Sequence, residues 1–512
     1  MQMKPEAEVR YPLKPDSVEP GLGGKAARGA AWSMGFQVSR QLLSILSVSV
    51  LARRVPPEAY GLLSMAGIVT NFMDSFRDLG TGNALIREGE VSERLLSSLF
   101  WFNLSLGVLL SACTALLAIP AAAFFRQPGL MKVMLALAPN FFIYSLSVIP
   151  NALLNRRMSF RALSVVQMAG AVLGTATGIG GALMGAGVWS LVFGALVSNL
   201  VISGATWIAC PWRPQFLVDM GEVRRIAAYS LNLSGFNFVN FFSRNADNLV
   251  VGRLLGDTQL GFYQMAYMLM TSPLTNFCSV IAGVVFPALS TFQNDDARLR
   301  AAFLRVVMLI GLVTIPAMFG LSVVAGPFIE VVLGAKWHPV AGLLLVFAPL
   351  GAFQSIYTMV GPIYNAKGRA DRLFQWSLIS GSVYVASFLV GAHWGIQGVA
   401  IAYAIAWMAM MIPGLAIPFR LVNLPGREFV RALWPGFACS LVMAFVAGLW
   451  RCALYKLGID SALIHLFSTA AVGGLCYAGL MLWWHPAAIT ELRAVPGASR
   501  LQSFLPRPRA GK

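Results

Sequence analysis

The sequence has little charge and few residues of the kinds that build metal or catalytic sites. Only 12% of its 512 residues are charged. The six cysteines have no CxxC spacing, which argues against a zinc site and a disulfide framework. The four histidines are dispersed, so no histidine metal site is expected. No P-loop pattern and no catalytic constellation are present. We therefore expect neither a cofactor nor enzyme activity.

Apolar residues dominate instead, at 57% of the chain with a mean hydropathy of +0.70. Apolar runs of about 20 residues, long enough to cross a hydrocarbon core of about 30 Å, recur along the chain. The alternation typical of membrane barrels is absent. The sequence predicts an all-α polytopic membrane protein with about fourteen spanning helices. These helices are expected at Ala31–Ala52, Tyr60–Ile86, Leu96–Ile119, Met131–Leu154, Phe160–Met184, Gly187–Ala209, Ile226–Leu255, Leu260–Leu289, Ala302–Leu333, Val340–Tyr364, Leu373–Ala392, Gln397–Pro418, Phe429–Leu457 and Ala462–Trp484.

An internal repeat divides these helices into two sets of six. The stretch Leu51–Gly61 is similar to Val251–Gly261, and Gly61 corresponds to Gly261 at an offset of 200 residues. The basic loops that begin at Asn155 and Asn365 extend the match. An even number of helices per repeat gives both halves the same orientation. Parallel repeats of this kind indicate two bundles with a substrate site between them.

The basic residues predict the orientation and explain the net charge of +17. With both termini in the cytoplasm, most loop Lys and Arg residues fall on the cytoplasmic side, so no nucleic-acid partner is needed to account for them. The expected organisation is a cytoplasmic tail (1–30), an N-terminal bundle (31–209), a cytoplasmic linker (210–225), a C-terminal bundle (226–418), two further helices (429–484) and a basic cytoplasmic tail (485–512).

Charged side chains within the predicted spans mark a candidate site, because each costs about 2.5–3.5 kcal/mol at a helix centre unless it is paired or hydrated. The predicted cavity residues are Gln37, Arg40, Arg244, Asp247 and Asn248. The guanidinium group of an arginine suits a phosphate, because it donates two parallel hydrogen bonds. The alternative is structural: Arg244 and Asp247, three residues apart, neutralise each other and hold helices together.

The second predicted helix carries a further charged group, formed by Asp74, Arg77 and Asp78. We expect these residues to act as gate or coupling residues near the cytoplasmic interface, or alternatively as a structural ion pair. On the fifth helix, the small-xxx-small spacing of Gly174 and Gly178 predicts close helix packing.

Several segments carry a family resemblance. They are Gly24–Trp32, Leu51–Arg53, Pro57–Gly61, Phe76–Gly80, Asp247–Gly256 and Gly261–Tyr263. Together they resemble the polysaccharide transporter branch of the multidrug/oligosaccharidyl-lipid/polysaccharide flippase superfamily, and most of all its lipopolysaccharide and exopolysaccharide exporters of the colanic-acid type. The resemblance covers the first twelve predicted helices.

This resemblance implies a flippase of the bacterial inner membrane that moves undecaprenyl-pyrophosphate-linked oligosaccharide repeat units to the periplasmic leaflet. It implies two six-helix bundles around a cationic cavity, with Arg40 and Arg244 contacting the pyrophosphate or acidic sugars. Asp247 would tune the cavity or take part in proton or sodium coupling. Beyond the lipid-linked substrate and membrane lipids, a polysaccharide polymerase and a chain-length regulator are the partners to consider.

Three alternatives stay open at this stage. One is a lipid II flippase of the same superfamily, and another is a multidrug cation antiporter, which would favour an acidic cavity. The third is a scaffold of a polysaccharide assembly complex that transports nothing. The glycan and the driving force are not specified by the sequence.

Overall fold

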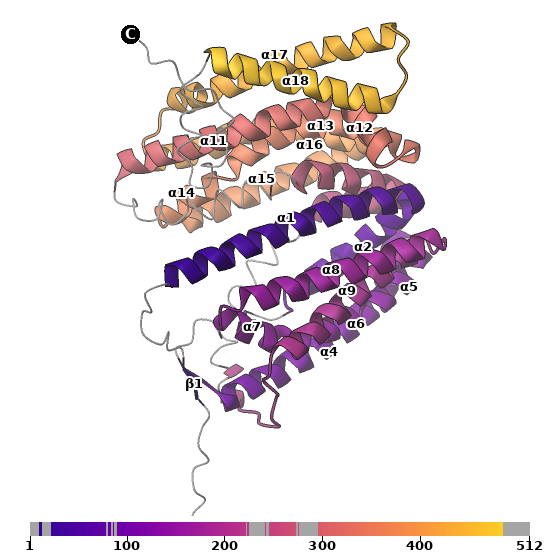
Figure 1. Cartoon of the computed structure of the whole chain (residues 1–512), viewed down its shortest axis with the longest axis vertical. Helices are drawn as coiled ribbons and strands as arrows, with labels where there is room; N and C mark the ends of the chain where they lie inside the picture. Colours follow the sequence, from indigo (N-terminus) through magenta and orange to yellow (C-terminus); the bar gives the residue numbers. More distant parts are fainter. Residues whose placement is uncertain are drawn as a thin grey trace, which may run out of the picture. The chain divides into compact units, whose positions relative to one another are not determined.

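The computed structural model describes residues 10–12, 22–77, 80–82, 85, 90–221, 223–224, 241, 245–272, 275 and 295–484, with side chains omitted at 10–12, 22–34, 37, 38, 90 and 370. The chain divides into two compact units, Met1–Gly261 and Phe262–Lys512, and each is described by itself. Helices make up nearly all of the described chain (Figure 1).

The first unit is a helical bundle with one small strand pair. Its helices are α1 (Leu22–Arg54), α2 (Pro57–Asp74), α4 (Glu93–Phe125), α5 (Pro128–Leu137), α6 (Pro139–Ser145), α7 (Val148–Arg156), α8 (Phe160–Leu183) and α9 (Val188–Ala209). Strands β1 (Arg10–Pro12) and β2 (Glu90–Ser92) pair antiparallel, with Tyr11 opposite Val91. This short pair joins the predicted N-terminal tail to the start of α4.

Local chemistry explains where several of these helices begin and bend. Ser92 caps α4 by accepting a hydrogen bond from the Leu95 amide at 3.1 Å. Pro57, Pro128 and Pro139 stand at first-turn positions, where a missing N–H costs nothing. The span expected at Met131–Leu154 is therefore a chain of three helices, and the axis bends by 42° between Pro128–Ser145 and Val148–Arg156.

Glycines bring α8 and α9 into close contact. A Cβ on Gly174 would lie 2.7 Å from the Gly194 carbonyl oxygen and 2.7 Å from the Ser198 Cβ. A Cβ on Gly178 would lie 3.3 Å from the Ser190 carbonyl oxygen. The close packing expected from the glycine spacing is therefore confirmed, and backbone approach is its cause.

The segment that follows α9 lies along α4. The Trp212 indole donates to Glu93 at 2.9 Å, and the Trp101 indole donates to the Gln215 carbonyl oxygen at 2.8 Å. The Ser98 hydroxyl accepts a hydrogen bond from the Asp219 amide at 2.7 Å. Side chains of α4 thus satisfy backbone groups of a segment that has no regular structure of its own.

A helical run over 245–272 links the two units. Gly256 within this run has a φ of +88°, a left-handed value that glycine adopts at no steric cost. The second unit then comprises α11 (Asp296–Val323), α12 (Ala325–Val332), α13 (His338–Tyr357), α14 (Val360–Ala366), α15 (Ala370–Gly391), α16 (Gly395–Leu421), α17 (Gly426–Lys456) and α18 (Ala462–Trp484), with 3₁₀ turns at Ala335–Trp337 and Ala392–Trp394.

Aromatic side chains fill the core of the second unit. Tyr263, Trp337 and Phe347 are fully buried, and the Tyr263 and Phe347 rings meet edge to face with centroids 5.4 Å apart. Helix α17 packs mainly against α11 and α18, and α15 packs against α16.

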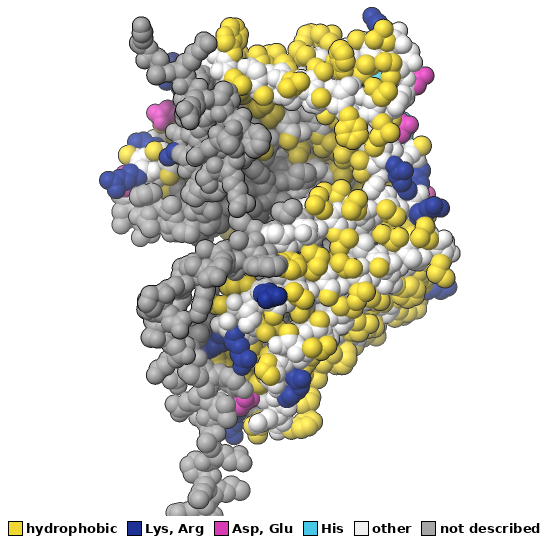
Figure 2. All heavy atoms as spheres, in the orientation of Figure 1, with side chains coloured by type: hydrophobic (Ala, Val, Ile, Leu, Met, Phe, Trp, Pro, Cys, Tyr) yellow, Lys and Arg dark blue, Asp and Glu magenta, His cyan; other side chains and the backbone are white. Residues whose placement is uncertain are grey.

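The outer surfaces of the helices are apolar, as expected of a protein embedded in lipid (Figure 2). Leu116 and Phe445, for example, are 73% and 68% exposed. Within the described part of the chain, eight helices are long and apolar enough to cross a membrane, or nine if the bent pair counts as one span. The prediction of an all-α polytopic membrane protein is confirmed.

Candidate functional site

A polar pocket lies inside the first unit, between α2, α5, α6 and α9. Its volume is about 160 Å³. Its lining residues are Thr70, Asn71, Asp74 and Arg77 from α2 and the turn after it, Leu137, Asn140, Phe141 and Tyr144 from α5 and α6, and Asn199 from α9. A cluster of amide, carboxylate and guanidinium groups within membrane helices is the feature that marks a functional site.

Asp74 and Arg77 are the charged residues of this pocket. The Arg77 Nη1 lies 2.9 Å from the Asp74 Oδ1, and the two side chains are 34% and 43% exposed. The Arg77 guanidinium also stacks on the Tyr144 ring, 3.4 Å from its centroid. Arg77 is thus stabilised by a carboxylate and an aromatic face together. Asp78, the third residue of the predicted group, lies outside the described residues.

Two asparagines form the opposite side of the pocket. The Asn199 amide donates to the Asn140 Oδ1 at 3.1 Å and so links α9 to α6. The Thr70 hydroxyl donates to the Ala66 carbonyl oxygen of its own helix at 3.1 Å. Hydrogen-bond donors and acceptors thus line one small space. Such a space suits a hydroxylated or anionic group that must be held without bulk water.

The sequence did not predict that Tyr144, Asn140 and Asn199 belong to this site. The available signal was their position, because all three are polar residues within apolar segments. Their connection to Asp74 and Arg77 depends on how α6 and α9 pack against α2.

Arg40 lies on α1, and its side chain is exposed. Of the residues predicted to accompany it, the side chain of Gln37 and the whole of Arg244 lie outside the described residues. The structure therefore gives the position of Arg40 but not those of the Gln37 and Arg244 side chains.

Asp247 and Asn248 lie on the helical run over 245–272. Asp247 is only 6% exposed, and its Oδ1 accepts a hydrogen bond from the Asn248 amide at 2.7 Å. The buried Oδ1 of Asn248 has no hydrogen-bond partner among the described residues. A buried acceptor without a partner is costly, which is a reason to expect a ligand, water or mobile side chain there.

The two repeat motifs meet at their glycines. A Cβ on Gly61 would lie 2.5 Å from the Asp257 carbonyl carbon, and one on Gly261 would lie 2.9 Å from the Pro57 carbonyl carbon. Between these contacts the Thr258 hydroxyl donates to Glu58 at 3.3 Å. At the offset of 200 residues, Gly61 corresponds to Gly261 and Pro57 corresponds to Asp257. The two glycine contacts are therefore equivalent, and the crossing is close to two-fold symmetric. The repeat thus marks a contact between α2 and the helical run over 245–272.

No three His, Cys, Asp or Glu side chains gather as metal ligands would, within the residues that the structure describes. The pocket offers hydrogen bonds, one ion pair and an aromatic face. These groups can bind and orient a ligand, and they can exchange partners when helices move.

Residues 50–342 match the family described as "Polysaccharide biosynthesis protein". Among similar proteins is the lipopolysaccharide biosynthesis protein WzxC of Escherichia coli, which is 25% identical over 86% of this chain and 88% of its own length. The teichuronic acid biosynthesis protein TuaB of Bacillus subtilis is 24% identical over 92% and 98%. The succinoglycan biosynthesis transport protein ExoT of Rhizobium meliloti is 26% identical over 89% and 92%.

The fold is shared with solved transporters. The lipid II flippase MurJ in an inward closed conformation aligns with a TM-score of 0.70, at 18% identity over 89% of this chain and 99% of its own. An inward-facing multidrug resistance MATE family transporter of the MOP superfamily aligns with a TM-score of 0.59, at 16% identity over 75% and 95%. The resemblance noted in the sequence is confirmed: the chain shares the fold of these two transporters and belongs to the polysaccharide biosynthesis protein family.

Proposed function

We propose that this protein is an inner-membrane flippase for undecaprenyl-pyrophosphate-linked oligosaccharide repeat units. It moves them from the cytoplasmic to the periplasmic leaflet for the synthesis of an exopolysaccharide, a capsule or an O-antigen. The family match over residues 50–342 carries this proposal, together with relatives named for lipopolysaccharide, teichuronic acid and succinoglycan biosynthesis.

The physical problem that such a protein solves is the desolvation of a glycan. Sugar hydroxyl groups that enter hydrocarbon lose their hydrogen bonds to water, at a cost of several kcal/mol for each group on alkane scales. A path lined by polar side chains replaces those hydrogen bonds while the lipid tail stays in the bilayer. The two repeats then alternate access by rocking against each other.

Within this proposal the basic residues hold the phosphates. Arg40 and Arg244 contact the pyrophosphate or acidic sugars, and Asp247 with Asn248 and Gln37 tunes the cavity. Asp74, Arg77 and Asp78 act as gate or coupling residues. The Asp74–Arg77 pair is partly exposed, so its opening costs little, and Arg77 keeps the Tyr144 ring as a second partner.

The chain acts as a transporter and not as an enzyme, with both termini in the cytoplasm. It works beside a polysaccharide polymerase and a chain-length regulator. Its driving force is a proton or sodium gradient, or consumption of the product on the periplasmic side.

The first test is deletion of the gene followed by an assay of where lipid-linked oligosaccharide accumulates. A flippase of this kind predicts accumulation on the cytoplasmic side and loss of surface polysaccharide in viable cells. Lethality with a build-up of lipid II would instead indicate peptidoglycan synthesis. Normal polymer with altered drug sensitivity would indicate an antiporter.

Complementation with variants separates transport from a scaffold. Arg40→Ala and Arg244→Ala should not restore the polymer although they reach the membrane at normal levels. Leu46→Ala is the matched control, because Leu46 lies on the same helix as Arg40 and is 63% exposed. Full polymer production by Arg244→Ala would support a scaffold that does not transport.

A further inference from the structure

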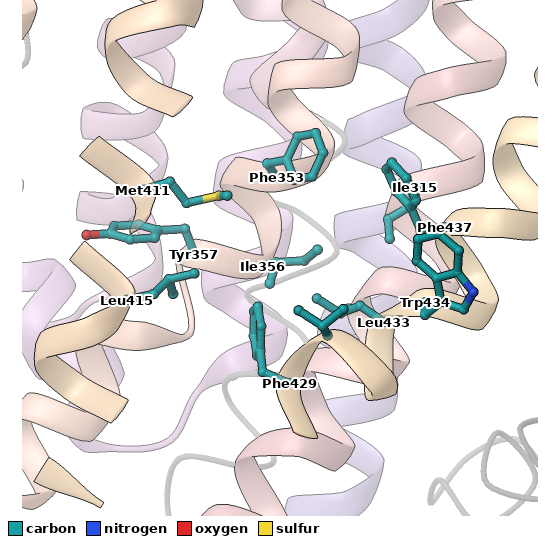
Figure 3. Close-up of a pocket in the computed structure, with 11 residues that line it drawn as sticks. Ile315, Phe353, Ile356, Tyr357, Met411, Leu415, Phe429, Leu433, Trp434 and Phe437 are labelled. Atoms are coloured by element: carbon teal, nitrogen blue, oxygen red, sulfur yellow. The ribbon is translucent and has the colours of Figure 1, made fainter. Parts of the chain in front are cut away.

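An apolar groove runs between α16 and α17 in the second unit. Two adjoining cavities of about 240 and 710 Å³ share Met411, Leu415, Phe429 and Val430. Figure 3 shows side chains from α11, α13, α16 and α17 converging on the first of these cavities. The second cavity continues from the first along α16 to the turn before α17.

The groove exists because consecutive helices do not pack closely against each other. The turn between α16 and α17 spans only Val422–Pro425, yet α17 packs mainly against α11 and α18. Val430 and Trp434 are each 57% exposed, so the groove opens to the side. An empty gap of this size would forfeit dispersion contacts on both walls, so in a bilayer a hydrocarbon chain fills it.

The interior of the groove has almost no free polar groups. The Tyr357 hydroxyl accepts a hydrogen bond from the Trp376 indole at 3.0 Å. The other lining side chains of the first cavity are aliphatic or aromatic, apart from the Met411 thioether, and Trp434 supplies one indole N–H. The interior therefore suits an unbranched apolar chain and offers few hydrogen-bonding groups to a sugar.

The mouth of the groove is basic. Arg420 and Asn423 line its end, and Arg427 and Arg431 follow on the first turns of α17. Glu428 is the only acidic residue between 419 and 431, so this segment carries a net positive charge. Asp296 of α11 also reaches this end, where it accepts a hydrogen bond from the Asn423 side chain, and Lys367 pairs with it. The turn itself is held in place, because Arg300 donates to the Asn423 carbonyl oxygen at 2.6 Å.

We propose that this groove is a binding site for an anionic phospholipid. One acyl chain lies between α16 and α17, and the phosphate lies at Arg420. An apolar slot that ends in exposed arginines complements such a lipid in both polarity and charge. Because the slot opens sideways, the phospholipids that surround the protein fill it by mass action. A phospholipid can occupy this groove whichever substrate the protein transports.

The test uses the purified full-length protein and phosphatidylglycerol with brominated acyl chains, which quench tryptophan fluorescence on contact. Wild-type protein should show a saturable quenching component that is lost in Trp434→Phe. Arg420→Ala should weaken this component about fivefold, the effect expected of one arginine at a lipid surface. Lys456→Ala, an exposed cation at the other end of α17, should leave it unchanged. Phosphatidylcholine carries no net charge. Wild-type protein should therefore bind brominated phosphatidylcholine no more tightly than the Arg420→Ala variant binds brominated phosphatidylglycerol.

A second variant fills the slot without changing charge. Val430→Phe should abolish the quenching component, whereas Leu441→Phe on the exposed side of the same helix should keep it. Equal binding of the two brominated lipids, or no effect of Arg420→Ala, would overturn the proposal. Displacement of phosphatidylglycerol by undecaprenyl phosphate at a far lower concentration would also overturn it, because the groove would then belong to a prenyl carrier.

Discussion

Gly61 and Gly261 lie where α2 crosses the helical run over 245–272, and each faces the backbone of the other helix. A Cβ on Gly261 would stand 3.2 Å from the Gly61 amide nitrogen. Glycine at both positions allows the two helices to approach more closely than any side chain permits. The internal repeat of the sequence therefore corresponds to a direct contact between the two motifs.

Replacement of Gly261 by Val should separate this crossing. The added side chain meets the Pro57 backbone, which cannot move aside as a flexible side chain does, so we expect a loss of about 1–3 kcal/mol in stability. The melting temperature of the purified protein measures it. Gly67→Ala on α2 is the control, because its Cβ would meet only the Asn71 side chain at 3.8 Å. Equal melting temperatures for the two variants would contradict the close contact.

The Asp74–Arg77 pair should behave as a coupled unit. Asp74→Asn removes the carboxylate partner of Arg77 and leaves the Tyr144 ring, so polymer export should fall, and Arg77→Gln should have a similar effect. In the double variant neither charge is left unpaired. A double-mutant cycle on melting temperature should give a coupling of about 0.5–1 kcal/mol, as expected for a partly exposed pair.

Ser75→Ala is the matched control for this cycle, because the Ser75 hydroxyl donates only to the Asn71 carbonyl oxygen of its own helix. Strictly additive effects of the Asp74 and Arg77 changes would show that the two side chains act independently.

Two glycines of α8 should respond in opposite directions to the same change. Gly174→Ala drives a methyl group into the Gly194 carbonyl oxygen and should destabilise the protein by about 1–3 kcal/mol. Gly180→Ala meets no atom within 4 Å and should stabilise the helix by about 0.4–1 kcal/mol. Thermal unfolding of both variants measures the difference. Destabilisation by Gly180→Ala would show that other atoms contact the face of α8 that carries Gly180.

The segment after α9 should loosen when Ser98 loses its hydroxyl. Ser98→Ala leaves the Asp219 amide without its acceptor, so residues 213–219 should become more sensitive to limited proteolysis. The expected stability loss is about 1 kcal/mol. Ser105→Ala serves as the control, because that hydroxyl donates only within α4, to the Trp101 carbonyl oxygen. Equal cleavage rates would mean that other contacts hold the segment.

The bounds of some membrane helices could be read from the sequence almost to the residue, whereas within the span expected at Tyr60–Ile86 helix α2 ends at Asp74. The span expected at Ala462–Trp484 has the bounds of α18, and the one expected at Gly187–Ala209 differs from α9 by one residue. Apolar run length translates directly into a span, so these elements needed no tertiary information. The segment at Met131–Leu154 was harder, because Pro139 starts a new helix inside an unbroken apolar run.

The candidate site was predictable only in part. Asp74 and Arg77 could be found because charge inside an apolar span is conspicuous. Tyr144 and Asn199 complete the pocket from other helices, and no spacing in the sequence relates them to α2. The cavity roles expected of Arg40 and Arg244 stay predictions.

The sequence by itself determined that this protein is a helical membrane protein of the polysaccharide biosynthesis family, because hydrocarbon permits few ways to satisfy a backbone and the repeat motifs lie in the chain. The tertiary structure alone decided which groups meet: Gly61 with the Asp257 backbone, Arg77 with Tyr144, and Met411 with Phe429 across the groove. Contacts between helices far apart in sequence depend on crossing geometry, which hydropathy does not encode.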